Sequence, residues 1–223
     1  SLSGEIGSHG EYYSISGRER RRPSSTGRLY FRPTISVFDA LSFSFNVLLS
    51  TEGNLQSAQH RINQINQFGI RPQWKWGYAN GGDFTESFTP LTLNGLTIRG
   101  GGISINPGLL RLSAVGGATR RIGAGINEGG FDRNIYAGKI GIGRESKSYF
   151  DFLFVRTRDI PSKFHPLEPD SVIVPDSAQV GTKIQYEETP QENLVVGIST
   201  SLKLFADALT MNTEFNGSAY TRD

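Results

Sequence analysis

The chain has 223 residues, among them 27 glycines, 14 phenylalanines and no cysteine, and its formal net charge is +2. The lack of cysteine excludes disulfides, thiolate metal sites and cysteine nucleophiles, and so small a net charge argues against a nucleic-acid partner. Only 36% of the residues are hydrophobic, and no stretch approaches the ~18 consecutive apolar residues that a membrane-spanning helix requires.

Apolar and polar residues alternate along most of the chain, as in residues 41–47, where Leu, Phe, Phe and Val alternate with Ser, Ser and Asn. Because a strand points successive side chains to opposite faces, this alternation predicts β-structure, with one short helix possible at Ser57–Ile65. We expect an all-β fold: an antiparallel up-and-down meander of about 11 long strands, near residues 3–15, 27–37, 41–51, 67–78, 94–106, 109–120, 131–143, 148–158, 179–188, 193–204 and 208–222.

Two kinds of connection alternate between these strands. Short turns are predicted at Phe38–Ala40, Asn106–Gly108, Arg144–Lys147, Thr189–Glu192 and Phe205–Asp207, and long loops near residues 51–67, 78–90, 120–130 and 158–178. A membrane barrel has short turns at one rim and long loops at the other. About 9–11 residues are also what a tilted strand needs to cross a bilayer. We therefore predict one domain over residues 1–223, an outer-membrane β-barrel or a segment of one.

Glycines fall inside several predicted strands, at Gly100–Gly102, Gly116–Gly117, Gly138, Gly141 and Gly143. Interior glycines mark bends or close approaches of the backbone. They favour a curved sheet over a flat one.

Two segments, Asp83–Gly102 and Gly27–Pro33, resemble parts of large, poorly characterised outer-membrane β-barrel proteins of the Bacteroidetes and Chlorobi–Ignavibacteria group. The resemblance implies a cell-envelope barrel and brings no catalytic residues. The strand count is odd, whereas bacterial single-chain barrels have even numbers, and the end of the chain, Ala219–Asp223, lacks the terminal aromatic residue of such barrels. We therefore expect the N-terminal part of a longer barrel, or one chain of a barrel closed by several chains.

The alternation assigns residues to two faces of the barrel wall. Candidates for the lumen-facing side are Asp83, Glu86, Arg99, Arg111, Lys139, Lys183, Glu187 and Glu214; Arg99 is expected to pair with Asp83 or Glu86. Candidates for the lipid-facing side are Phe43, Phe45, Phe150, Phe152, Phe154, Ile184, Ile198, Leu202 and Phe215. Trp74, Trp76 and Tyr78 are placed on one face of a single strand as candidate interfacial aromatics, with ordinary core aromatics as the alternative.

No pattern indicates catalysis. His9, His60 and His165 are too far apart in sequence for a metal-ligand spacing, and there is neither a nucleophile elbow nor a phosphate-binding loop. We predict no enzyme, cofactor or metal, and a structural, transport or channel role in the bacterial outer membrane. The expected partners are the lipid bilayer and further β-strands of the same or other chains. The alternative is a soluble or surface-exposed β-rich assembly or binding subunit, located at the cell surface or outside the cell, that pairs through its sheet edges.

Overall fold

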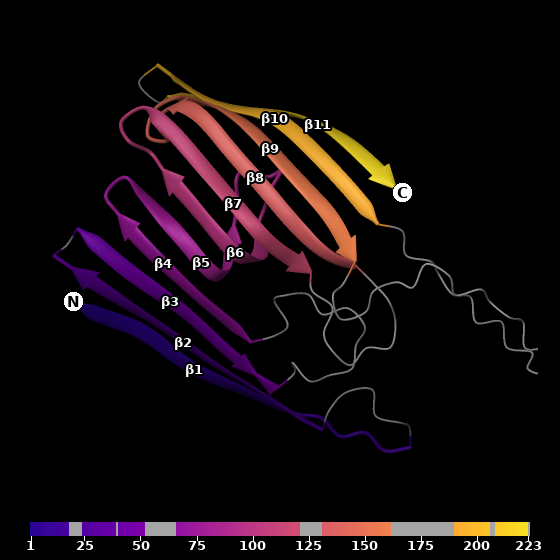
Figure 1. Ribbon diagram of the computed structural model, residues 1–223. Coiled ribbons are helices and arrows are strands. Elements are labelled where there is room, and N and C mark those ends of the chain that lie inside the picture. The colour runs from indigo at the N-terminus through magenta and orange to yellow at the C-terminus, as the bar shows by residue number, and fades with distance from the viewer. Residues whose placement is uncertain are drawn as a thin grey trace, which may run out of the picture.

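The computed structural model describes residues 1–17, 24–38, 40–51, 66–120, 131–161, 190–205 and 208–222. Eleven antiparallel strands form one sheet in which every strand is hydrogen-bonded to its neighbours in sequence (Figure 1). The sheet is not closed, because β1 and β11 are not paired with each other. None of the described residues forms a helix long and apolar enough to cross a bilayer. The prediction of an all-β up-and-down meander is confirmed.

Most strands are longer than the five or six residues usual in soluble proteins. Their bounds are β1 Leu2–Tyr12, β2 Ser25–Val37, β3 Leu41–Ser50, β4 Gln67–Trp74, β5 Gly77–Glu86, β6 Leu96–Ile105, β7 Leu110–Arg120, β8 Phe131–Gly143, β9 Tyr149–Pro161, β10 Gln191–Leu204 and β11 Leu209–Arg222.

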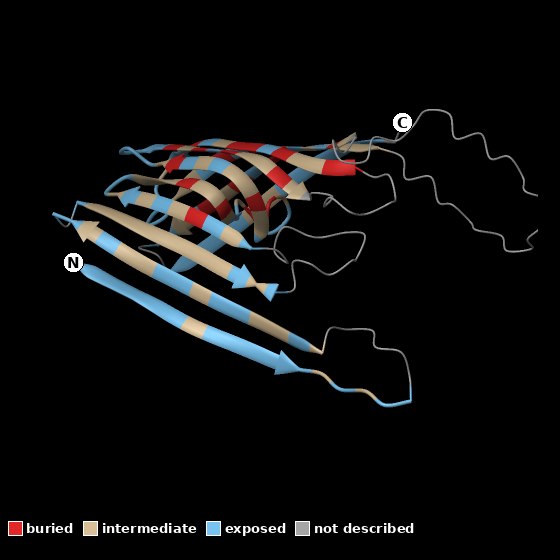
Figure 2. Cartoon of the chain, turned by 60° about the horizontal axis from the view of Figure 1, so that its bottom comes forward, coloured by how far each residue is buried: buried red, intermediate tan, exposed pale blue. Residues whose placement is uncertain are grey.

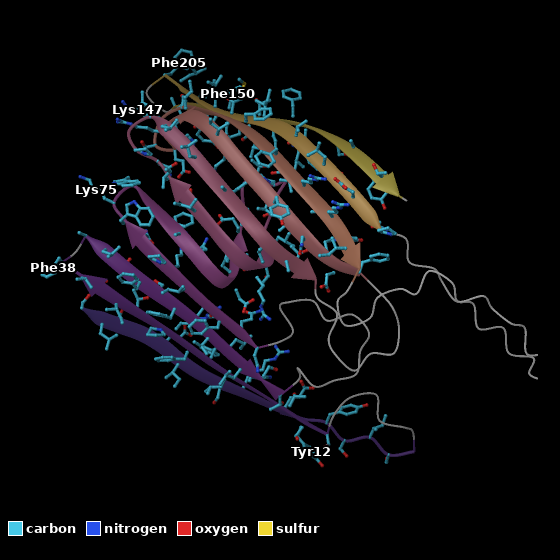
Figure 3. The ribbon with its side chains drawn as sticks, viewed as in Figure 1. Tyr12, Phe38, Lys75, Lys147, Phe150 and Phe205 are labelled. Atoms are coloured by element: carbon cyan, nitrogen blue, oxygen red, sulfur yellow. The ribbon has the colours of Figure 1, made fainter. Side chains whose placement is uncertain are left out.

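Short and long connections alternate along the chain, as predicted. Tight turns join β2 to β3, β4 to β5, β6 to β7, β8 to β9 and β10 to β11, and longer segments make the other connections. Figure 3 shows the turn residues Phe38, Lys75, Lys147 and Phe205 along one end of the sheet, and Tyr12 near the opposite end. We call these the turn end and the loop end.

The structure corrects the sequence prediction at one hairpin. Residues 67–78 do not form one strand, because the chain reverses between Trp74 and Gly77, which face each other across the turn. Most of the predicted loop 78–90 is instead strand β5. The possible helix at Ser57–Ile65 and the predicted strand 179–188 lie outside the described residues, and the predicted turn at Thr189–Glu192 overlaps the start of β10. The predicted strand 67–78 is therefore two strands, β4 and β5, and the described residues form eleven strands in all.

The register divides the side chains between two faces, since residues opposite each other on neighbouring strands share a face. We call the face that carries Ile98, Val115, Ile135 and Val155 the inner face, and the opposite one the outer face. Thr89, in the connection between β5 and β6, bonds Glu214 of β11, so the sheet curls around the inner face. Buried positions gather on the central strands, while β1 to β3 have none (Figure 2).

Glycines allow the central strands to approach closely. A Cβ atom added at Gly100 would lie 2.1 Å from the carbonyl oxygen of Gly116 and 2.6 Å from the Cα atom of Gly117. Real Cβ atoms do not come this close to backbone atoms. The pairing of β6 with β7 therefore requires glycine here, in agreement with the curved sheet predicted from the glycine pattern.

This close approach predicts that Gly100→Ala is destabilising by about 1–3 kcal/mol, the usual cost of overpacking. Gly101→Ala is a matched control on the next residue, because its added Cβ would meet nothing nearer than an oxygen atom at 3.7 Å. Denaturant unfolding followed by loss of the β-sheet circular dichroism signal measures both variants. Equal stability of the two variants would contradict the close approach.

Candidate functional site

The inner face of β1 to β4 is polar. Arg32 of β2 donates to the side-chain oxygen of Asn46 of β3 over 3.1 Å, and the hydroxyls of Thr34 and Ser44 are also 3.1 Å apart. Glu5 of β1 lies 4.0 Å from Arg32. These side chains are exposed or half-buried. This part of the inner face is a solvent-accessible surface with charges of both signs.

A buried ion pair lies on the inner face near the turn end of the central strands. The guanidinium of Arg111 in β7 donates two hydrogen bonds, of 2.8 and 3.0 Å, to the carboxylate of Asp151 in β9. Arg111 also approaches Glu145 at 3.3 Å, and its guanidinium carbon lies 4.3 Å from the centre of the Tyr149 ring. Arg111 and Asp151 are buried. Two parallel bonds of this kind fix the geometry of the planar guanidinium and carboxylate groups.

A second ion pair occupies the loop end of the same face. Arg133 of β8 donates to both carboxylate oxygens of Asp159 in β9, at 2.6 and 2.7 Å, and to the side-chain oxygen of Gln191 in β10. The two ion pairs therefore flank the centre of the inner face along the strand direction.

Between these pairs the inner face is mainly apolar and buried, with Lys139 among its polar residues. Ile98, Val115, Ile135, Ala137 and Val155 are all buried there. The segment 87–95, which connects β5 to β6, folds back over this centre: its Leu93 is buried within the same cluster, and Phe88 packs against it. An apolar centre of this kind would be costly if it faced water, so the covering segment is part of the architecture.

Further contacts hold segment 87–95 in place. The hydroxyl of Thr89 donates to the carboxylate of Glu214 in β11, across the inner face of β6 to β10. The Lys139 amino nitrogen lies 5.4 Å from the centre of the Phe88 ring. Segment 87–95 therefore contacts strands that are far from it in sequence.

Glu86 belongs to a polar cluster beside segment 87–95. Its carboxylate accepts hydrogen bonds of 3.0 Å from the Tyr78 hydroxyl and from the Asn80 amide. The guanidinium carbon of Arg71 lies 3.7 Å from the centre of the Tyr78 ring. The cluster lies between the dry centre and the polar half of the inner face.

The structure separates the residues that the sequence assigned to the lumen-facing side. Glu86, Arg111, Lys139 and Glu214 have the register of the inner face. Asp83 and Arg99 pair with each other, as expected, at 2.6 and 2.8 Å. Their register is that of the outer face, because the neighbouring pair Phe84 and Ile98 faces inward; for these two residues the structure differs from the sequence assignment. Lys183 and Glu187 lie outside the described residues.

The residues assigned to the lipid-facing side have the register of the outer face, except Ile184, which lies outside the described residues. These are Phe43, Phe45, Phe150, Phe152, Phe154, Ile198, Leu202 and Phe215. The placement of Trp74, Trp76 and Tyr78 on one strand face is wrong. Trp74 ends β4 and packs edge-to-face on Trp76 in the turn, whereas Tyr78 begins the inner face of β5.

Sequence reasoning missed segment 87–95. The signal was present in Thr89-Pro90-Leu91-Thr92, because proline is favoured at the second position of a tight turn, and the Thr92 amide does bond the Thr89 carbonyl. No local sequence pattern reveals that this turn lies against strands that are far from it in sequence.

Within the described residues, the inner face offers polar contacts and ion pairs. Within the described residues, no group of three or more histidine, aspartate or glutamate side chains is placed to hold a metal ion. Of the histidines, His9 lies in β1, and His60 and His165 lie outside the described residues.

Comparisons with protein-family models, with curated proteins and with solved structures found no match to this chain.

The buried ion pair generates a prediction. Asp151→Asn keeps the size of the side chain but leaves the Arg111 cation buried without its counter-ion, and we expect a loss of about 3–5 kcal/mol in the free energy of unfolding. Glu192→Gln is the matched control, because Glu192 pairs with the exposed Arg156 and such pairs contribute only about 0–1 kcal/mol.

Both variants are measured by denaturant unfolding, together with Arg111→Met and the double variant. We expect the double variant to lose less stability than the sum of the single losses, since neither charge is then stranded. Additive losses would show that the two side chains do not act as a pair.

Proposed function

We propose that this chain is a wall of a bacterial outer-membrane β-barrel, with a structural or a transport role. One observation carries the proposal: the outer face exposes large apolar side chains on strands from β1 to β11. Examples are Ile6 in β1, Phe31 in β2, Phe68 in β4, Ile140 in β8 and Phe215 in β11. Monomeric soluble proteins rarely expose continuous apolar surfaces of this kind, whereas a lipid-facing wall requires one.

The outer face is apolar near the turn end of the central strands and charged toward the loop end. From the turn end of β9 its outer residues are Phe150, Phe152 and Phe154, followed by Arg156 and Arg158. Arg156 and Arg158 share Glu192 of β10, at 2.6 and 3.6 Å. Arginines bordering an apolar band are suited to lipid headgroups, because the long side chain extends its charge toward the polar layer.

Strand length and connection rhythm also support a membrane wall. All strands except β4 have ten or more residues, and ~9–11 tilted residues span the apolar layer. Short turns gather at one end and long connections at the other, as in outer-membrane barrels.

The second candidate function is a surface-exposed β-assembly that pairs through its sheet edges. The open edges of β1 and β11 favour it, since an unpaired edge is a template for a further strand. In this case the apolar outer face would contact protein rather than lipid.

Detergent dependence separates the two candidates. A lipid-facing wall should be monodisperse in detergent or vesicles and should aggregate when the detergent is removed. A chain that stays monodisperse in detergent-free buffer would rule out the membrane wall and leave the surface assembly.

A lysine on the outer face provides a second test. If Phe152 lies near the bilayer midplane, Phe152→Lys should destabilise the inserted state by ~2–4 kcal/mol. Ser44→Lys is the control, because Ser44 lies on the polar inner face beside Thr34. Insertion into vesicles is measured by protease protection and by urea titration. Normal insertion of Phe152→Lys would show that this face does not contact lipid.

A further inference from the structure

We propose that segment 87–95 is a fixed plug inside the barrel wall, and that aqueous passage runs along the polar inner face of β1 to β4. The inference rests on the membrane function proposed above and specifies where that wall is open to water. The substrate class it implies is small hydrophilic solutes, including ions of either sign.

Hydrogen bonds within the plug make it rigid. The Phe88 amide bonds the Leu93 carbonyl at 2.7 Å, and the Gly95 amide bonds the Ser87 hydroxyl at 2.7 Å. The hydroxyls of Thr89 and Thr92 bond each other. Because the Thr89 proton goes to the Glu214 carboxylate, Thr92 is the donor in this pair. Segment 87–95 thus satisfies many of its polar groups internally, which a freely moving loop would leave to water.

The plug is also anchored on the wall. Leu93 is 2% exposed and lies in one cluster with Ile98 of β6, Val115 of β7 and Val155 of β9. The Thr89 hydroxyl adds a bond to β11. Apolar burial at the centre and a charge-assisted bond at the far edge hold the segment at two places.

The inner face of β1 to β4 is polar, unlike the apolar centre that the plug covers. Across β2 and β3, Arg32 bonds Asn46 and Thr34 bonds Ser44, and Arg71 extends the polar surface on β4. Among the described residues, the only buried position on this part of the inner face is Gly69, which carries no side chain. Water can therefore reach these side chains, whereas the plug excludes it from the centre of β6 to β10.

Cysteine accessibility tests the proposal directly, because the chain has no cysteine of its own. Three single variants of the full chain are placed in phosphatidylcholine vesicles and treated with a charged, membrane-impermeant thiosulfonate. Ser44→Cys reports on the polar inner wall, Ala137→Cys on the centre beneath the plug, and Phe152→Cys on the outer face. Denatured samples of each variant provide the reference rate.

We expect Ser44→Cys to react readily and Ala137→Cys to react at least about tenfold more slowly, because a thiol beneath the plug is reached only through local opening. Phe152→Cys should be protected in vesicles. Equal rates for Ser44→Cys and Ala137→Cys would overturn the plug, and protection of Ser44→Cys would overturn the aqueous passage along β1 to β4. Rapid reaction of Phe152→Cys in vesicles would instead overturn the membrane function itself.

Loosening the plug gives an independent check. When Leu93→Ser is combined with Ala137→Cys, the thiol should react faster, at a rate closer to that of Ser44→Cys. When Leu93→Ser is combined with Phe152→Cys, the thiol should stay protected. Thr89→Ala, which removes the bond to Glu214, is the milder variant and should raise the rate in the same direction. No increase with either change would refute the covering role of the segment.

Ionic conductance in planar bilayers tests the passage. Reaction of Ser44→Cys with the thiosulfonate should lower the conductance, and the same treatment of Ala137→Cys should leave it unchanged. Absence of conductance, or a conductance insensitive to modification at Ser44→Cys, would refute passage along β1 to β4.

Discussion

The antiparallel register is the constraint on which the rest of the structure depends. A slip of one residue between two strands would exchange the faces of every side chain beyond it, so the apolar outer face exists only if each hairpin keeps its pairing. The tight turns at one end of the sheet secure that pairing over eleven strands. Both faces, and any function assigned to them, follow from this repeated register.

The inner face combines two physical environments on one sheet. On the central strands, apolar burial and the shielded Arg111–Asp151 pair make a dry body, and the plug completes it. On β2 and β3, Arg32 bonds Asn46 and Thr34 bonds Ser44, and these side chains are exposed or half-buried. The charges of a buried ion pair are costly to desolvate, and such a pair is retained only where its geometry is good. This accounts for the position of the Arg111–Asp151 pair on the packed central strands.

The sequence predicted much of the fold and less of the site. Alternation found most of the strands, and the outer-face assignment of Phe150, Phe152 and Phe154 matches the observed register. It failed at Trp74–Gly77, because a two-residue turn reverses the chain without interrupting the run of aromatic residues. It also placed Asp83 and Arg99 on the lumen side, since charge alone suggested a wet face; the pair is instead satisfied by mutual hydrogen bonds at the loop end.

By itself, the sequence determined the all-β class, most of the hairpin turns and the two-faced character of most strands, because these depend on periodicity and turn chemistry within short stretches. Only the tertiary structure decided that residues 87–95 lie on the inner face and that Thr89 meets Glu214, 125 residues away. That contact depends on how far the sheet curls between β6 and β11, which is the sum of small twists and close approaches over many strand pairs. No local pattern encodes such a sum.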